Sequence, residues 1–117
     1  MLSLLPGMKV YLAIGITDMR KAINGLSILV EGQMELDPFA GHLFGFCNRK
    51  RDIIKILYWD RSGFCLWQKR LEKERFRWPE SEADVLTIEN RELSWLIDGL
   101  SIAQSEAHGR LTFSSML

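Results

Sequence analysis

The spacing of apolar residues in the first third of the chain predicts a strand followed by a helix. Residues 8–14 form an apolar run that ends at Gly15, which is typical of a strand. From there to about residue 34, apolar residues recur at spacings of three and four, as on one face of a helix. They are Met19, Ile23, Leu26 and Val30. Thr17 and Asp18 precede them, and we expect their side-chain oxygens to cap this helix.

After a turn at residues 37–41, the pattern changes to short strands. Residues 43–47, 53–59 and 64–69 are predicted strands separated by short turns, and the second of them is rich in β-branched and aromatic side chains. Three such strands in succession predict an antiparallel meander. Between the last two, Asp60 begins and Gly63 ends a four-residue turn, which favours a type I turn followed by a left-handed glycine. In that geometry residue 60 pairs with residue 64.

The rest of the chain predicts a smaller set of elements. Residues 76–78 and 85–87 suggest a further hairpin around Pro79, and a short closing helix follows. The apolar residues that mark this helix are Leu93, Leu96, Ile97 and Leu100. Residues 103–117 show no clear period, and we expect a mobile tail there. The fold class we predict is α+β: one domain over residues 1–102 with a largely antiparallel sheet.

Composition places the chain among ordinary globular proteins. It has 117 residues, of which 47% are hydrophobic and 26% charged, and its formal net charge is zero. No apolar run reaches the roughly 18 residues of a membrane-spanning helix, and the N-terminus does not read as a signal peptide. Two cysteines are too few for a disulfide framework. We therefore expect a cytoplasmic protein with reduced thiols and no contact with a membrane.

The neutral average conceals two oppositely charged regions. Residues 49–77 hold ten basic and four acidic side chains, whereas residues 78–106 hold one arginine and seven acids. Such a split steers a polyanion to one face, or lets two copies pair head to tail into a homo-oligomer. The alternative is that the two regions neutralise each other within the fold.

The sequence offers no convincing catalytic or metal-binding constellation. Neither a Cys-x-x-Cys pair nor a histidine pair at helical spacing occurs, and no phosphate-binding glycine loop is present. The carboxylates that a two-metal nuclease would need each have a local structural explanation. They are Asp18, Asp37, Asp52 and Asp60. An extended strand would hold the last two about 25 Å apart. We predict no catalytic residue, no metal and no cofactor.

The basic hairpin of residues 53–70 is the most informative feature. In the register predicted above, Lys55 lies opposite Lys69, and both share a sheet face with Trp59 and Trp67. Facing lysines repel each other, and an anion between them would relieve the repulsion. Lysines among aromatic rings are typical of single-stranded nucleic-acid platforms. The alternatives are that a helix covers the tryptophans while the lysine stems extend to water, or that a one-residue shift in the turn changes the pairing.

The turn at residues 48–51 adds an exposed cationic point, for which the alternative is an ordinary solvated turn. Our candidate DNA-binding residues combine this turn with the hairpin face. They are Arg49, Lys50, Arg51, Lys55, Trp59, Trp67, Lys69 and Arg70.

Four ordered motifs give the chain a family resemblance. They are TDMRK at 17–21 with Gly25 and Leu26, DPFAGHLF at 37–44, YWD at 58–60 with GFCLW at 63–67 and KRL at 69–71, and FRWP at 76–79. With these motifs the chain resembles the small accessory proteins, called TnpB, of the insertion-sequence-66 family of bacterial transposable elements. The resemblance covers about residues 5–102. It implies a role in transposition beside a separate transposase that carries the catalytic acidic triad, and no catalytic residues here.

Three functions are compatible with these observations. The first is a DNA-associated accessory module that acts with the transposase of the same element on element DNA. The second is a protein-interaction adaptor without DNA contact, in which the acidic region at 78–106 would matter more. The third is a metal-dependent nuclease, which we rank last because no ligand set is visible.

Overall fold

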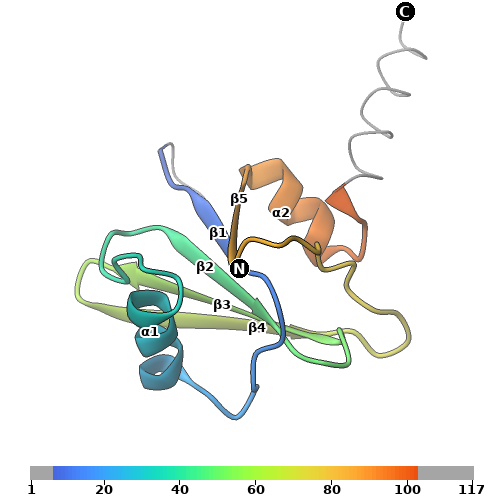
Figure 1. Ribbon diagram of the computed structural model, residues 1–117, viewed down its shortest axis with the longest axis horizontal. Helices are drawn as coiled ribbons and strands as arrows, with labels where there is room; N and C mark the ends of the chain where they lie inside the picture. The colour runs from blue at the N-terminus through green and yellow to red at the C-terminus, as the bar shows by residue number, and fades with distance from the viewer. Residues whose placement is uncertain (1–6, 103–117) are drawn as a thin grey trace, which may run out of the picture.

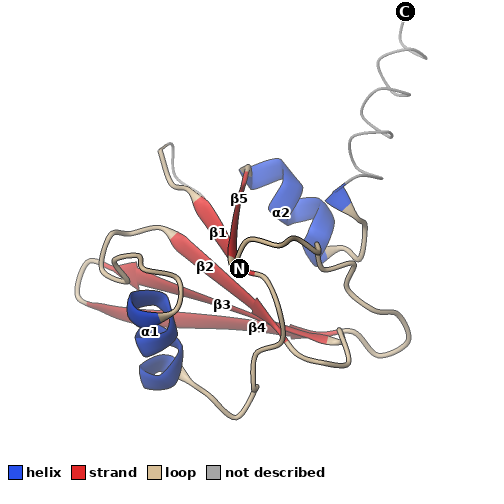
Figure 2. Cartoon of the chain, in the orientation of Figure 1, coloured by secondary structure: helices blue, strands red, loops and turns tan. Residues whose placement is uncertain are grey.

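In the part of the chain that the structure describes, a five-stranded mixed sheet carries one helix on each face (Figure 1). The computed structural model describes residues 7–102. In chain order the elements are β1 (Val10–Ala13), α1 (Ile23–Gly32), β2 (Leu43–Cys47), β3 (Ile53–Asp60), β4 (Gly63–Arg70), β5 (Val85–Ile88) and α2 (Asn90–Ile97) (Figure 2). Neither helix, at ten and eight residues, is long enough to cross a bilayer, and no other helix in residues 7–102 is. The predicted tail at 103–117 lies outside the described residues.

The strand order is β4-β3-β2-β1-β5, and three of the four pairings are antiparallel. The exception is β1 with β2, which run parallel because the chain crosses through α1 between them. The predicted α+β class and the β2-β3-β4 meander are confirmed. The predicted strand at 85–87 is also confirmed, but it pairs with β1, so the expected hairpin with residues 76–78 is wrong.

Each face of the sheet carries its own hydrophobic core. On one face, α1 packs over the central strands, and the buried residues there are Leu26, Val30, Met34, Phe44, Phe46 and Leu57. On the other face, Leu93 and Leu96 of α2 pack with Phe76 and Trp78 against the sheet. Residues 76–78 alternate buried, exposed, buried, as a strand does. Their aromatic rings instead pack into the core on this face, and the Trp78 ring would lie 3.4 Å from a Cβ added at Gly45 of β2.

The helix after β1 begins later than predicted. It starts at Ile23, and no side chain caps it, so the expected capping by Thr17 and Asp18 is wrong. Asp18 accepts hydrogen bonds from the backbone amide and the guanidinium of Arg20 instead. The Lys55 ammonium donates to the carbonyls of Met19 and Lys21, 2.9 Å from each. These contacts hold residues 18–22 as a loop and delay the helix. By contrast, the predicted short closing helix is confirmed as α2, which runs from Asn90 to Ile97 and ends before Leu100.

The β3–β4 hairpin differs from prediction by one residue. Asp60 pairs with Gly63, not with residue 64, so the loop has two residues. The left-handed residue of this loop is Arg61, with φ of 50°, and not the glycine. A shift of one residue sends every side chain of a strand to the opposite face. Lys55 therefore lies opposite Gln68, and the predicted face shared by the two lysines and two tryptophans does not exist.

Candidate nucleic-acid interface

The turn between β2 and β3 is held rigidly by one asparagine. The Asn48 carboxamide oxygen accepts hydrogen bonds from the amides of Asp52 and Ile53, at 3.1 and 3.0 Å. Its nitrogen donates to the Asp52 carboxylate at 2.6 Å. These three hydrogen bonds take the place of the strand pairing between β2 and β3, which ends before the turn. Arg49 and Lys50 consequently extend from a fixed backbone into solvent, as predicted for this turn.

A second basic segment runs beside this turn. We call residues 71–79, which follow β4, the strap. Its Leu71 amide donates to the Asp52 carbonyl at 2.8 Å, and its Phe76 amide donates to the Arg51 carbonyl at 2.6 Å. The Arg75 guanidinium reaches the Lys50 carbonyl at 3.3 Å. These contacts bring cations from the turn and the strap together at one end of the sheet. We call this group the basic end: Arg49, Lys50, Arg51, Arg70, Lys73, Arg75 and Arg77.

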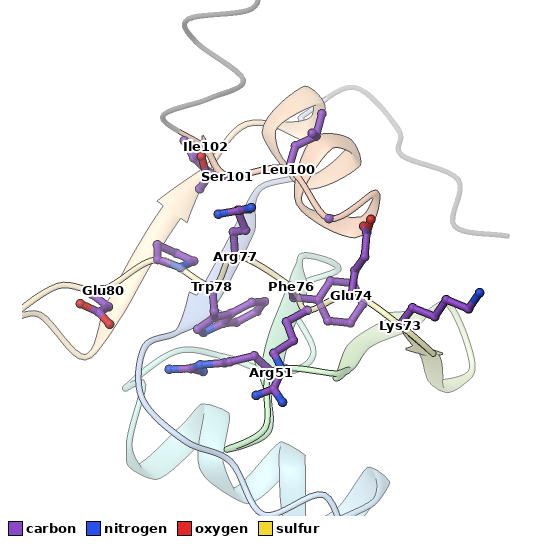
Figure 3. Close-up of a pocket in the computed structure, with 13 residues that line it drawn as sticks. Arg51, Lys73, Glu74, Phe76, Arg77, Trp78, Glu80, Leu100, Ser101 and Ile102 are labelled. Carbon is purple, nitrogen blue, oxygen red and sulfur yellow. The ribbon is translucent and has the colours of Figure 1, made fainter.

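Two open grooves flank the turn, and both carry basic side chains. Figure 3 shows the groove between the strap and the segment after α2, where Arg77 and Trp78 point to opposite sides of the strap and Lys73 points away from the centre. Four cations of the basic end line it, together with Glu74 and Glu80. The second groove lies between the turn and residues 16–19, and Arg49, Lys50 and Arg70 line it. The turn thus forms a cationic ridge between two depressions.

Three carboxylates beside the basic end already have hydrogen-bond partners, and one of these partners, Arg70, belongs to the basic end itself. Asp52 accepts from Asn48, Glu72 pairs with Arg70 at 3.1 Å, and Asp18 pairs with Arg20 at 2.6 Å. The hydrogen bonds from Arg20 lower the pKa of Asp18 from 3.8 to about 2. Six cations of the basic end form no ion pair within 4.0 Å anywhere in residues 7–102. They are Arg49, Lys50, Arg51, Lys73, Arg75 and Arg77.

The structure brings together half of the residues predicted to bind DNA. Arg49, Lys50, Arg51 and Arg70 all lie in the basic end. Arg51 is half-buried, and its guanidinium donates to the Gly15 carbonyl at 3.4 Å. Sequence reasoning missed Lys73, Arg75 and Arg77 as site residues. Their contribution to the charge excess at 49–77 was the available signal, but only the strap's path shows that they lie beside the turn.

The two predicted lysines of the sheet lie on opposite faces and bind backbone carbonyls. Lys55 is 7% exposed and points toward the α1 face, where its ammonium bonds to the loop carbonyls described above. The Lys69 ammonium donates to the Ile97 carbonyl at 3.0 Å, at the C-terminal end of α2. That end of a helix attracts cations because its carbonyls are unpaired. Both ammonium groups therefore have structural partners.

The two predicted tryptophans are likewise separated by the sheet. Trp59 packs against Phe39 and Phe64 at the opposite end from the β2–β3 turn, with ring centroids 5.1 and 5.0 Å away. Trp67 packs into the core on the α2 face. No stacking platform beside the basic end is formed by these residues.

No metal centre is formed by the residues described, 7–102, among which no group of three or more His, Cys, Asp or Glu is close enough to hold an ion. Cys47 and Cys65 are free thiols. Burial raises the pKa of the Cys47 thiol, and the neighbouring Arg51 guanidinium offsets part of this rise. Asp52 and Asp60 flank the two ends of β3, as the sequence implied.

Comparison with known proteins finds a matching family model and two similar sequences. The model of one family, described as IS66 Orf2 like protein, matches residues 8–107. Two similar proteins are known from Sinorhizobium fredii (strain NBRC 101917 / NGR234), both named only as uncharacterized. The protein y4hO is 37% identical over 92 residues, which cover 79% of this chain and 80% of its own length. The protein y4jC is 34% identical over 94 residues, which cover 80% of each. No solved structure matches the chain significantly.

Proposed function

Because the chain belongs to the IS66 Orf2-like family, accessory proteins of IS66 transposition, we propose that it acts by binding element DNA through the basic end. The observation that carries this proposal is the gathering of unpaired cations from the turn and the strap. A cation without a carboxylate partner is free to neutralise a phosphate and to release its counterion. The turn, which forms a ridge between two grooves, also suits a DNA backbone that crosses it.

The binding we propose is sequence-independent. Arginine and lysine side chains that contact phosphates position a protein on DNA, whereas contacts to base edges provide sequence choice. Within residues 7–102 the basic end presents no helix that could enter a major groove, since α1 and α2 cover the two sheet faces. We assign the choice of element ends to another component, and we propose that the transposase of the same element provides it.

We also propose that the protein does not cleave DNA itself. Asp18 and Asp52 are hydrogen-bonded to Arg20 and Asn48, and Asp60 lies at the far end of β3. This separation argues against a shared two-metal site, in which ions lie about 3.5–4 Å apart. The proposed role is therefore that of a binding subunit beside a separate catalytic transposase.

The double variant Arg49→Gln/Lys50→Gln tests the DNA contact. We leave Arg51 unchanged because the residue is half-buried and its guanidinium donates to the Gly15 carbonyl. With labelled duplexes of the element end and of a scrambled sequence, affinity should fall about tenfold or more at 0.1 M salt for both. The slope of log affinity against log salt should decrease by about two, at roughly 0.9 per phosphate contact.

The matched control is Lys9→Gln/Arg61→Gln, which removes the same charge from the other end of the sheet. Lys9 precedes β1, and Arg61 lies in the β3–β4 turn, so neither belongs to the basic end. The control should keep the wild-type affinity and salt slope. If both double variants lose affinity equally, only net charge matters and the assignment to the basic end is wrong. If the wild-type protein does not bind either duplex, DNA binding is refuted.

A further inference from the structure

Three aromatic rings cluster at the end of the sheet opposite the basic end. Phe39, in the loop after α1, contacts Trp59 and Phe64 from the β3–β4 hairpin, with all centroid distances between 5.0 and 5.1 Å. Figure 1 shows this loop and the β3–β4 turn at the same side of the molecule. We call Phe39, Trp59 and Phe64 the aromatic patch. An eight-residue strand spans about 23 Å, so β3 separates the patch from the basic end by roughly that distance.

The exposure of Phe39 is imposed by its loop. The side chain is 52% exposed, although Trp59 and Phe64 are each half-buried. The Asp37 carboxylate accepts a hydrogen bond from the Phe39 amide at 2.9 Å, and the Asp37 carbonyl accepts one from Ala40 at 3.2 Å. This turn holds the phenylalanine ring outward against the tryptophan edge. A rigidly held aromatic side chain at a partly open surface is typical of a protein-binding hot spot.

The charges around the patch favour a basic partner. Asp37 and Asp60 flank the rings in sequence, both are exposed, and neither forms an ion pair within residues 7–102. Arg61 is the cation of the same turn. Aromatic faces attract arginine and lysine side chains, and adjacent carboxylates strengthen that attraction while repelling phosphates. The patch is thus complementary to a basic segment with an apolar anchor, and unsuited to a nucleic-acid backbone.

We propose that the aromatic patch docks a basic, apolar-anchored segment of a second protein of the transposition complex. DNA-binding proteins carry such basic segments, and the transposase of the same element is the probe that tests the proposal. The protein then has two separate binding ends joined by the β3–β4 hairpin, one for phosphate and one for protein. This inference depends on family membership and on the patch, and it does not require the basic end to bind DNA.

The test compares Phe39→Ala with Ile28→Ala. Ile28 is an aliphatic side chain of α1 that is 69% exposed and is absent from both core clusters, so it controls for loss of exposed apolar surface. With purified transposase in biolayer interferometry, Phe39→Ala should weaken binding by about tenfold or more. Ile28→Ala should bind like wild type. A second variant, Asp60→Asn, should weaken binding severalfold and reduce its dependence on salt.

The remaining outcomes separate this proposal from its competitors. Phe39→Ala should keep the wild-type affinity for duplex DNA, and circular dichroism should show an unchanged fold. If wild-type protein does not bind the transposase, or Phe39→Ala binds it unchanged, the proposal is wrong. A loss of self-association in analytical ultracentrifugation would assign the patch to a second copy instead. A loss of affinity for single-stranded DNA would assign it to base stacking. Neither result would affect the duplex-binding test of the basic end.

Discussion

Replacing Lys55 by methionine should destabilise the protein without weakening its contact with DNA. The lysine was a DNA candidate from sequence, yet its side chain is only 7% exposed and its ammonium donates to two carbonyls at 2.9 Å. These carbonyls, of Met19 and Lys21, belong to the loop that joins β1 to α1. Methionine keeps the length and the apolar stem of lysine, so Lys55→Met removes mainly the two hydrogen bonds.

The expected decrease in the free energy of unfolding is the difference between opposing contributions. Hydrogen bonds from a charged donor contribute about 1.5–3 kcal/mol each. Removal of the ammonium also removes its desolvation cost, and the freed carbonyls regain some water because Arg20 and Lys21 are exposed. We therefore expect a net decrease of about 2–3 kcal/mol in the free energy of unfolding. For a domain of this size that corresponds to a decrease of about 10 °C or more in Tm.

Urea unfolding followed by circular dichroism measures this loss, with Lys50→Met as the control in the exposed turn. The control should stay within about 0.5 kcal/mol of wild type. A loss below that value for Lys55→Met would show that the two hydrogen bonds contribute little, and the structural role would be refuted. If folded Lys55→Met loses as much DNA affinity as Arg49→Gln/Lys50→Gln, the lysine belongs to the interface after all.

Two further predictions concern packing and charge. Gly45→Ala should cost about 1–3 kcal/mol in the same unfolding assay, because the added Cβ would lie 2.8 Å from the Leu12 side chain. Gly32→Ala, where nothing lies within 4 Å of the added Cβ, should be neutral or slightly stabilising, and the prediction fails if the two cost the same. In NMR titrations the Asp18 carboxylate should stay charged until the pH falls to about 2. Arg20→Ala should return its midpoint toward 3.8, and an unchanged midpoint would contradict the assigned cause.

Much of the fold follows from local pattern. The strands at 43–47, 53–59 and 64–69 were predictable because short apolar and aromatic runs bounded by turn residues fit a pleated, half-buried surface. The closing helix was predictable from its apolar spacing, and its capping box of Glu89 and Glu92 reinforces it. The residue at which α1 begins was not predictable, because the ammonium of Lys55, which is distant in sequence, holds the loop before the helix. Local propensity gave way there to a tertiary contact.

The candidate site also has a part that the sequence predicts and a part that it does not. A charge excess at 49–77 is readable from sequence, since charged side chains near a turn reach solvent in almost any fold. The hairpin face was wrong because the turn has two residues instead of three, and a one-residue change moves the side chains of one strand to the opposite face relative to the other strand. Either loop length satisfies the local turn preferences of Asp60 and Gly63. Packing selects the two-residue loop. It places Trp59 against Phe39 on one face of the sheet and Trp67 in the core on the other face.

By itself, the sequence determined which segments are extended or helical, where the net positive charge is concentrated, and which family the chain resembles. These properties depend on neighbours within a few residues, or on the order of motifs. The tertiary structure decided which cations share a surface and which are used internally. It placed Arg75 beside Lys50 while directing Lys55 and Lys69 to backbone carbonyls. The physical reason is that burial and hydrogen-bond partners arise between residues dozens of positions apart, where a shift of one position in a ladder changes every contact.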